Sequence, residues 1–135
     1  MLLAHMTLSD KPFMGSVTEP SRAQDSVDMC EILFGKDFVQ NNTVKTSLIN
    51  INSPLTFDDV MMGSLEIYAR NNQAAIISPF IVGGAMAPVS VAGTLTQVMA
   101  EVMAGIAYSQ LIRKGAVDPG SGRLGGQVEE AFLVA

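Results

Sequence analysis

Residues 45–52 read KTSLININ and residues 74–81 read AAIISPFI, and these two short apolar runs decide the fold. Ser53–Pro54 ends the first run, because proline lacks the N–H that a strand ladder needs and restricts the residue before it. The second run is apolar on both faces, which is typical of a parallel strand covered on both sides. Each run leads into a segment with helical spacing, so the pattern predicts two strand-then-helix units.

A third unit lies upstream of these two runs. Residues 11–17 form a shorter apolar run, and a helix is expected over residues 18–35, with one apolar face made of Ala23, Val27, Cys30 and Phe34. Residues 36–44 are expected to form a loop. In the second unit, Thr56 and Asp59 give a capping-box-like pattern that predicts the start of a helix. We therefore expect three consecutive β/α units.

Residues 83–112 form a long apolar segment. A helix is expected from Pro88 to about Ile112, with a buried face made of Leu95, Val98, Val102 and Ile106. The segment exceeds the ~20 residues that a membrane span needs. However, Gln97, Glu101 and Gln110 lie within it, and a carboxylate inside a membrane is costly. A buried helix of a soluble protein is therefore favoured, and a membrane-associated protein anchored by residues 83–112 is kept as an alternative.

Three β/α units in series predict a parallel sheet with right-handed connections. The expected strand starts recur at intervals of roughly 30 residues, the span of a βαβ unit. This pattern does not separate a barrel from an open doubly wound sheet. A fourth strand is expected after Gly115, but residues 117–126 are polar and rich in turn-forming residues. We expect the tail, residues 117–135, to be poorly ordered.

Composition narrows the classes of function. The 135 residues suffice for one compact domain but are about half of a typical barrel of ~250 residues. A net charge of −5, with eight Lys and Arg residues that do not cluster, argues against nucleic-acid binding. The single cysteine, Cys30, excludes an internal disulfide framework and is expected to be a buried structural thiol. Residues 1–6 lack the basic region of a signal peptide, so we expect a cytoplasmic protein.

Candidate binding residues follow two of the predicted strands. In a parallel barrel, the C-terminal ends of the strands and the loops after them line the active site. The residues at these positions are Asn50, Asn52, Ser53, Ser78, Phe80, Gly83 and Gly84. Ordinary hydrogen bonding at a strand end explains any single one of them more simply, but as a set they predict the rim of a substrate pocket. No catalytic motif or metal site is identified, and helix capping is the better explanation for Asp58 and Asp59.

Five longer runs resemble one protein family. They are TLSDKPFMGSV at residues 7–17, NTV at 42–44, SLININSPL at 47–55, GGAMAPVSVAGTL at 83–95 and AEVMAG at 100–105. Together they are similar to the trimethylamine:corrinoid methyltransferases over residues 6–116. The resemblance implies that residues 1–116 form part of a (β/α)8 barrel, with about three of its β/α units, whereas residues 117–135 match nothing in the family. Such a chain is expected to be a fragment that is inactive alone.

The resemblance also implies an activity. Family members move a methyl group from a methylated amine, either trimethylamine or a betaine, to a cobalt(I) corrinoid carried by a partner protein. Some members contain pyrrolysine at a position outside the matched part, so the sequence does not decide the substrate. A betaine is favoured because members without pyrrolysine are the more numerous.

The expected partners are therefore a corrinoid protein and a small methylated amine, with no nucleic acid and no membrane. Whether the full-length enzyme is a homo-oligomer is left open, and so are the catalytic residues. Taken without the resemblance, the residues also leave open a small non-catalytic α/β binding module.

Overall fold

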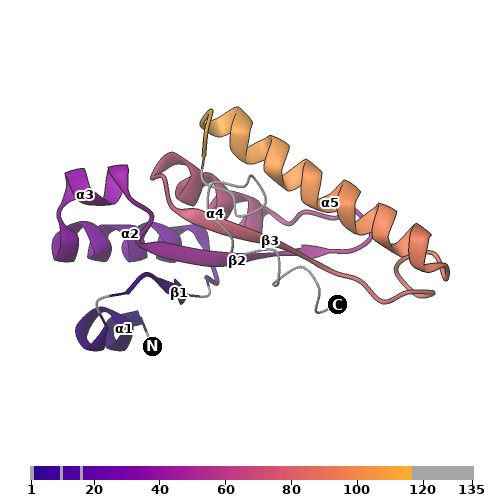
Figure 1. Ribbon diagram of the computed structural model, residues 1–135, viewed down its shortest axis with the longest axis horizontal. Coiled ribbons are helices and arrows are strands. Elements are labelled where there is room, and N and C mark those ends of the chain that lie inside the picture. Colours follow the sequence, from indigo (N-terminus) through magenta and orange to yellow (C-terminus); the bar gives the residue numbers. More distant parts are fainter. Residues whose placement is uncertain (1, 10, 16, 117–135) are drawn as a thin grey trace.

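Strands and helices alternate along the chain (Figure 1). A computed structural model describes residues 2–9, 11–15 and 17–116. The elements are α1 (Leu2–Leu8), β1 (Phe13–Gly15), α2 (Pro20–Phe34), α3 (Lys36–Asn41), β2 (Lys45–Asn52), α4 (Asp59–Arg70), β3 (Ala74–Phe80) and α5 (Val91–Ile112). The three predicted β/α units are all present, and the expectation for residues 117–135 lies outside the described residues.

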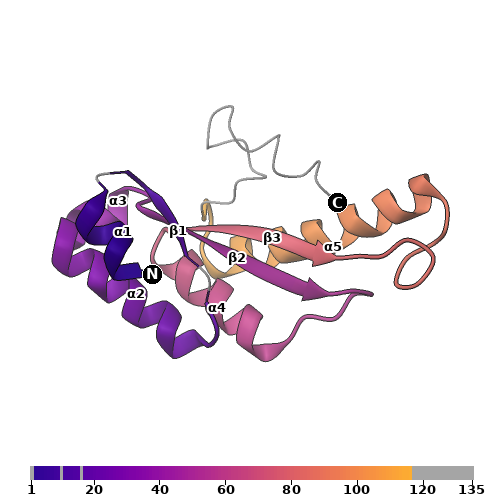
Figure 2. The ribbon, with the colours of Figure 1, turned by 90° about the horizontal axis from the view of Figure 1, so that it is seen from below.

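β2 is the central strand of a parallel sheet with the order β1–β2–β3. β2 and β3 lie side by side and point in the same direction, from Thr46 opposite Ala74 to Asn52 opposite Phe80 (Figure 2). β1 is shorter and pairs with β2 only over Phe13–Gly15. The predicted parallel sheet is thus confirmed, and the bounds of β2 agree with the predicted strand at residues 45–52.

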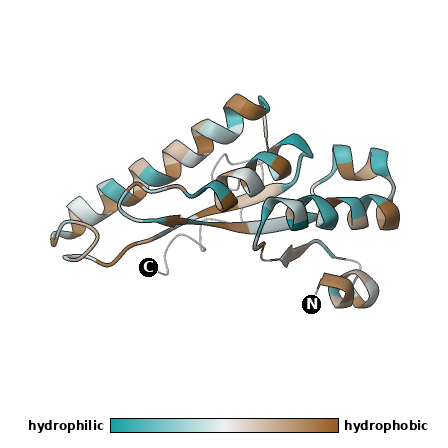
Figure 3. Ribbon diagram, turned by 180° about the vertical axis from the view of Figure 1, so that it is seen from behind, coloured by the Kyte–Doolittle hydropathy of each residue, from teal (hydrophilic) through white to brown (hydrophobic). Residues whose placement is uncertain are grey.

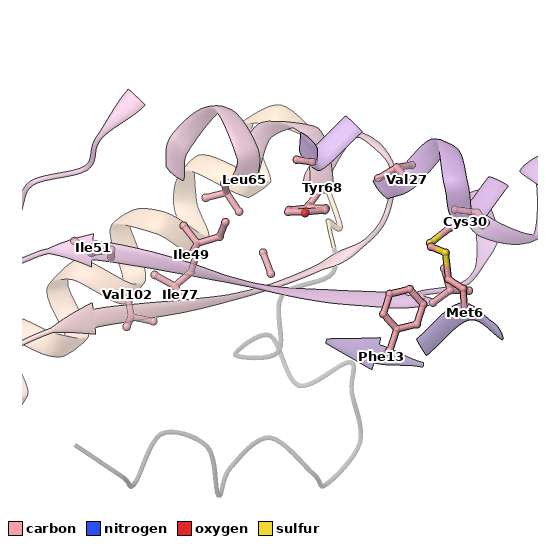
Figure 4. Packing of buried hydrophobic residues seen from close by; sticks show 14 residues of the cluster. Met6, Phe13, Val27, Cys30, Ile49, Ile51, Leu65, Tyr68, Ile77 and Val102 are labelled. Carbon is pink, nitrogen blue, oxygen red and sulfur yellow. The ribbon is translucent and has the colours of Figure 1, made fainter. Parts of the chain in front are cut away.

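One face of the sheet is covered by helices α4 and α5 (Figure 4). The side chains that meet there are Ile49 and Ile51 of β2, Ile77 of β3, Leu65 and Tyr68 of α4, and Val102 of α5. All six are almost completely buried, and burial of each such large apolar side chain contributes roughly 1.5–3 kcal/mol. α2 packs beside α4 and completes this layer.

The opposite face of the sheet is the more open one. Thr46 and Leu48 of β2 are half-buried there, and Asn50 and Asn52 are exposed.

The helices mix apolar and polar residues along their length (Figure 3), as expected where one side packs and the other meets solvent.

The apolar face of α5 is only partly covered. Val102 is buried and Val98 and Ile106 pack against the core, as predicted. Leu95 is 57% exposed, so the prediction that it is buried is wrong. The reason is that the N-terminal half of α5 extends beyond the strands (Figure 1). As for the alternative of a membrane anchor, none of the helices in the described residues is long and apolar enough to cross a membrane.

Two helix starts and one loop differ from the sequence-based expectation. α4 is capped by Asp58, whose side chain accepts a hydrogen bond from the Met61 N–H, and not by Thr56. α5 is capped by Ser90 instead of starting at Pro88. Residues 36–44, expected as a loop, contain α3, whose Val39 is fully buried.

A buried amide fastens α3 and the start of β2 to the turn before β3. The Gln73 side chain is 2% exposed. Its Oε1 accepts hydrogen bonds from the backbone N–H groups of Val44 and Lys45, at 3.0 and 3.1 Å. Its Nε2 donates to the carbonyl oxygens of Val39 (2.9 Å) and Asn71 (3.0 Å) and lies 3.3 Å from that of Asn42.

Cys30 is buried, as predicted, at the N-terminal end of the sheet, where Met6 and Phe13 pack near it (Figure 4). Burial raises the pKa of the Cys30 thiol above its ordinary value of 9.0, and the nearby Lys45 ammonium offsets part of this shift. Lys45 is itself buried, and its ammonium donates hydrogen bonds to Ser26 Oγ and, at 2.9 Å, to Tyr68 Oη. The folded state therefore favours the protonated thiol.

We expect the Cys30 thiol to resist alkylation in the folded protein. We also expect its ionisation to lower the free energy of unfolding at alkaline pH. Because the folded-state pKa lies above the unfolded one, the contribution to stability is complete below about pH 9 and declines as the pH rises through the folded-state value. Iodoacetamide labelling followed by mass spectrometry, with and without denaturant, measures the first effect. Comparing unfolding free energies of the wild type and Cys30→Ala between pH 8 and 11 isolates the second. Equal labelling of folded and unfolded protein would contradict the prediction.

Candidate functional site

The C-terminal edge of the sheet brings four of the predicted site residues together. The register pairs Asn50 with Ser78 and Asn52 with Phe80. Paired residues of parallel strands point to the same face, and here it is the face opposite the helices. Asn50, Asn52 and Phe80 are exposed, and Ser78 is half-buried. Two amides, a hydroxyl and an aromatic ring therefore share one open surface at the end of the strands where parallel α/β proteins bind ligands.

Asn52 and Asp58 are linked across the loop that follows β2. Asn52 Nδ2 donates to Asp58 Oδ2 at 3.3 Å, while Asp58 Oδ1 accepts from the Met61 N–H at 2.8 Å. Asn52 also exchanges two backbone hydrogen bonds with Thr56, each 3.0 Å long. The interpretation of Asp58 as a helix cap is confirmed, and the same carboxylate holds the Asn52 amide.

Ser53 lies in this loop, immediately after β2, and its side chain points toward α5. Its hydroxyl donates to Glu101 Oε2 at 2.6 Å. The structure thus gives Ser53 a hydrogen-bond partner inside the protein, and its predicted contact with substrate stays a prediction.

Gly83 and Gly84 form part of a tight turn between β3 and α5. Gly84 has a φ of +83°, a conformation that favours glycine, and its N–H donates to the Ala87 carbonyl at 2.8 Å. Gly83 and Ala87 form a parallel bridge. The turn is fastened to α5 because Gln97 Nε2 donates to the Met86 carbonyl at 2.8 Å.

Glu101 is the residue at this edge that sequence reasoning missed as part of the site. It lies in α5 and is completely buried. Its Oε1 accepts from the Leu55 N–H at 2.9 Å and from Gln97 Nε2 at 3.0 Å, and its Oε2 accepts from Ser53 Oγ. The available signal was a carboxylate inside an apolar helical segment, four residues after Gln97. In the sequence alone, this carboxylate argues against a membrane span but does not indicate a place in the site.

Within residues 2–9, 11–15 and 17–116, no three or more His, Cys, Asp and Glu side chains group so that they could hold a metal ion. The histidine, His5, stacks on Phe13 with ring centroids 5.8 Å apart. What the edge offers is amide, hydroxyl and aromatic contact for a small molecule.

These features define a parallel α/β protein with a polar and aromatic surface at the C-terminal ends of its strands. A family model described as trimethylamine methyltransferase matches residues 1–118. The glycine betaine methyltransferase of Desulfitobacterium hafniense (strain Y51) is 46% identical over 116 residues, which are 85% of this chain and 24% of that protein. The chain therefore belongs to the trimethylamine methyltransferase family, and it spans about a quarter of the length of the curated relative.

Proposed function

We propose that this chain is part of a methyltransferase that removes a methyl group from a betaine or, less favoured, from trimethylamine. The observation that carries this proposal is the 46% identity to a glycine betaine methyltransferase, which extends over both strands and loops of the candidate site. The exposed amides and aromatic ring at that edge are suited to a small zwitterion.

The sheet supports a (β/α)8 barrel as the architecture of the whole enzyme. Its strands follow one another in the order β1–β2–β3, and the helices between and after them lie on one face. A doubly wound sheet reverses its strand order to cover both faces, whereas a barrel keeps one order and one outer helical layer. In a barrel, the open face with Asn50 and Asn52 becomes part of the interior.

Two side chains are proposed to recognise the two ends of a betaine. Phe80 is 69% exposed at the end of β3, and the face of an aromatic ring attracts a quaternary ammonium. Asn50 lies on the neighbouring strand, two residues before Asn52, the register partner of Phe80, and is also exposed. Its amide N–H groups can donate to a carboxylate. Together the two would orient the methylated nitrogen for transfer.

The methyl acceptor is proposed to be a cobalt(I) corrinoid carried by a partner protein. When bound, this group would supply the nucleophile that accepts the methyl group. Asn50, Asn52 and Phe80 lie near the C-terminal ends of their strands, and the active site of a barrel opens at that end. The role left to these residues is to bind the amine and to present a methyl group toward the open side of the edge.

Phe80→Ala in the intact protein is expected to raise the KM for glycine betaine about tenfold, which corresponds to ~1.4 kcal/mol of lost cation–π attraction. Methyl transfer from glycine betaine to cob(I)alamin, followed by absorbance, gives the rates. Phe38→Ala is the matched control, because Phe38 is an exposed phenylalanine of α3, outside the candidate site. Phe80→Leu separates the aromatic from the apolar contribution.

Two outcomes would contradict the proposal, each at a different level. An unchanged KM in Phe80→Ala would remove this residue from the proposed site while leaving the activity in place. A wild-type protein that transfers no methyl group from either glycine betaine or trimethylamine would remove the proposed function itself.

A further inference from the structure

Glu101 is a buried carboxylate whose hydrogen bonds converge from different parts of the chain. Ser53 and Leu55 belong to the loop after β2, and Gln97 lies one turn earlier in α5. A buried carboxylate is unfavourable unless hydrogen bonds replace its water, and bonds to an ionised acceptor are the stronger ones. The three donors meet this requirement, so Glu101 ties the loop after β2 firmly to α5.

The loop that Glu101 holds has a conformation that the chain does not adopt readily by itself. Leu55 has a φ of +55°, in the left-handed region that leucine rarely occupies. Its N–H is the group that donates to Glu101 Oε1, while its side chain is 62% exposed. Such a conformation persists only where surrounding contacts impose it, and it is found preferentially at functional sites.

The same loop carries residues of the candidate site. Asn52 and Thr56 close it through their two backbone hydrogen bonds, and the Asn52 amide is exposed beside Phe80. On the other side, Gln97 bonds both to Glu101 and to the Met86 carbonyl in the turn after β3. The two loops that border the open edge are therefore joined through one buried carboxylate and one amide.

We infer that Glu101 is a positioning residue of the amine site, which fixes residues 53–56 and with them the Asn52 side of the pocket rim. The substrate named in this inference rests on the proposed function. The hydrogen bonds by which Glu101 holds the loop do not depend on it. Loss of the link lets the loop leave the binding-competent arrangement, and the apparent affinity falls in proportion to the fraction of molecules that keep it.

The test compares Glu101→Gln with Ser109→Ala in the intact protein. Glutamine keeps the size of Glu101 but loses its charge and one of its two acceptor oxygens. Ser109 is a buried polar residue of the same helix whose hydroxyl donates to the Ile106 carbonyl, so its alanine variant controls for a general disturbance of α5. Ser53→Ala, which removes a single bond to Glu101, is the milder second variant.

We expect Glu101→Gln to raise the KM for glycine betaine about tenfold, with kcat within about twofold of the wild type. Deuterium uptake in residues 53–56, measured by mass spectrometry, should become about tenfold faster. Ser53→Ala should shift both quantities in the same direction by a smaller factor, and Ser109→Ala should shift neither.

Unchanged KM and unchanged uptake in Glu101→Gln and Ser53→Ala would overturn the inference. A fall in kcat at constant KM would also overturn it, because that result marks a loss of active protein and not a displaced binding loop. If the wild type transfers no methyl group, the proposed function fails, and deuterium uptake alone then decides whether Glu101 fixes the loop.

Discussion

Replacing Gln73 by leucine is expected to lower the free energy of unfolding by about 3–5 kcal/mol, because it leaves several buried backbone groups without partners. The N–H groups of Val44 and Lys45 both donate to Gln73 Oε1. The Val39 and Asn71 carbonyl oxygens both accept from its Nε2. Leucine fills a similar volume but offers none of these bonds, and Gln73 is too deeply buried for water to replace them.

Urea denaturation of the intact protein, followed by circular dichroism, measures this loss. Gln40→Leu is the matched control, because Gln40 is a half-buried glutamine of α3 whose two side-chain hydrogen bonds, to Glu31 and Asn71, are each 3.3 Å long. We expect the control to cost less than ~1 kcal/mol. A similar loss in both variants would show that the network around Gln73 does not hold the start of β2.

The strands were the part of the fold that the sequence predicted well. β2 agrees with its predicted bounds and β3 differs only at its C-terminal end, because buried parallel strands give short apolar runs bounded by breakers such as Ser53–Pro54. α3 was missed because six residues are too few for a helical period to be recognised. Its position depends on contacts such as those of Gln73, which join residues about thirty positions apart in the sequence.

The position of the candidate site could be predicted from the sequence, but the hydrogen bonds that hold it together could not. Strand ends can be read from a sequence, so the side-by-side placement of Asn50 with Ser78 and of Asn52 with Phe80 followed once the strands were right. The burial of Glu101 could not be read in the same way, because a charged residue in a helix is normally exposed. It depends on the left-handed conformation of Leu55, for which the local sequence gives no pattern.

Helix starts show the same limit on a smaller scale. Thr56 with Asp59 and Asp58 with Met61 are both sensible capping arrangements at the level of sequence. The structure uses Asp58, because Thr56 is occupied in its backbone pairing with Asn52. The residue that caps α4 is therefore determined by the conformation of the loop between Asn52 and Thr56.

Gly105→Val is expected to destabilise the protein by about 2–3 kcal/mol, because α5 approaches β3 closely at this glycine. A Cβ atom there would lie 3.1 Å from Ile77 Cγ2 and 3.2 Å from its Cγ1 and Cδ1. Replacing glycine in a helix normally gains up to ~1 kcal/mol in propensity, less for a β-branched residue. The overlap with a fully packed core side chain outweighs this gain.

The clash has one identifiable partner, so a second substitution can relieve it. Ile77→Ala alone should cost about 2–5 kcal/mol through the cavity that it leaves. The double variant should be more stable than the sum of the two losses predicts, by about 1–2 kcal/mol, because valine at 105 fills part of that cavity. Ala104→Val, at the exposed neighbouring position, controls for β-branching in the helix and should change stability by less than ~1 kcal/mol. Additive losses in the double variant would mean that Gly105 of α5 does not contact the Ile77 side chain. The position of α5 along β3 would then have to be different.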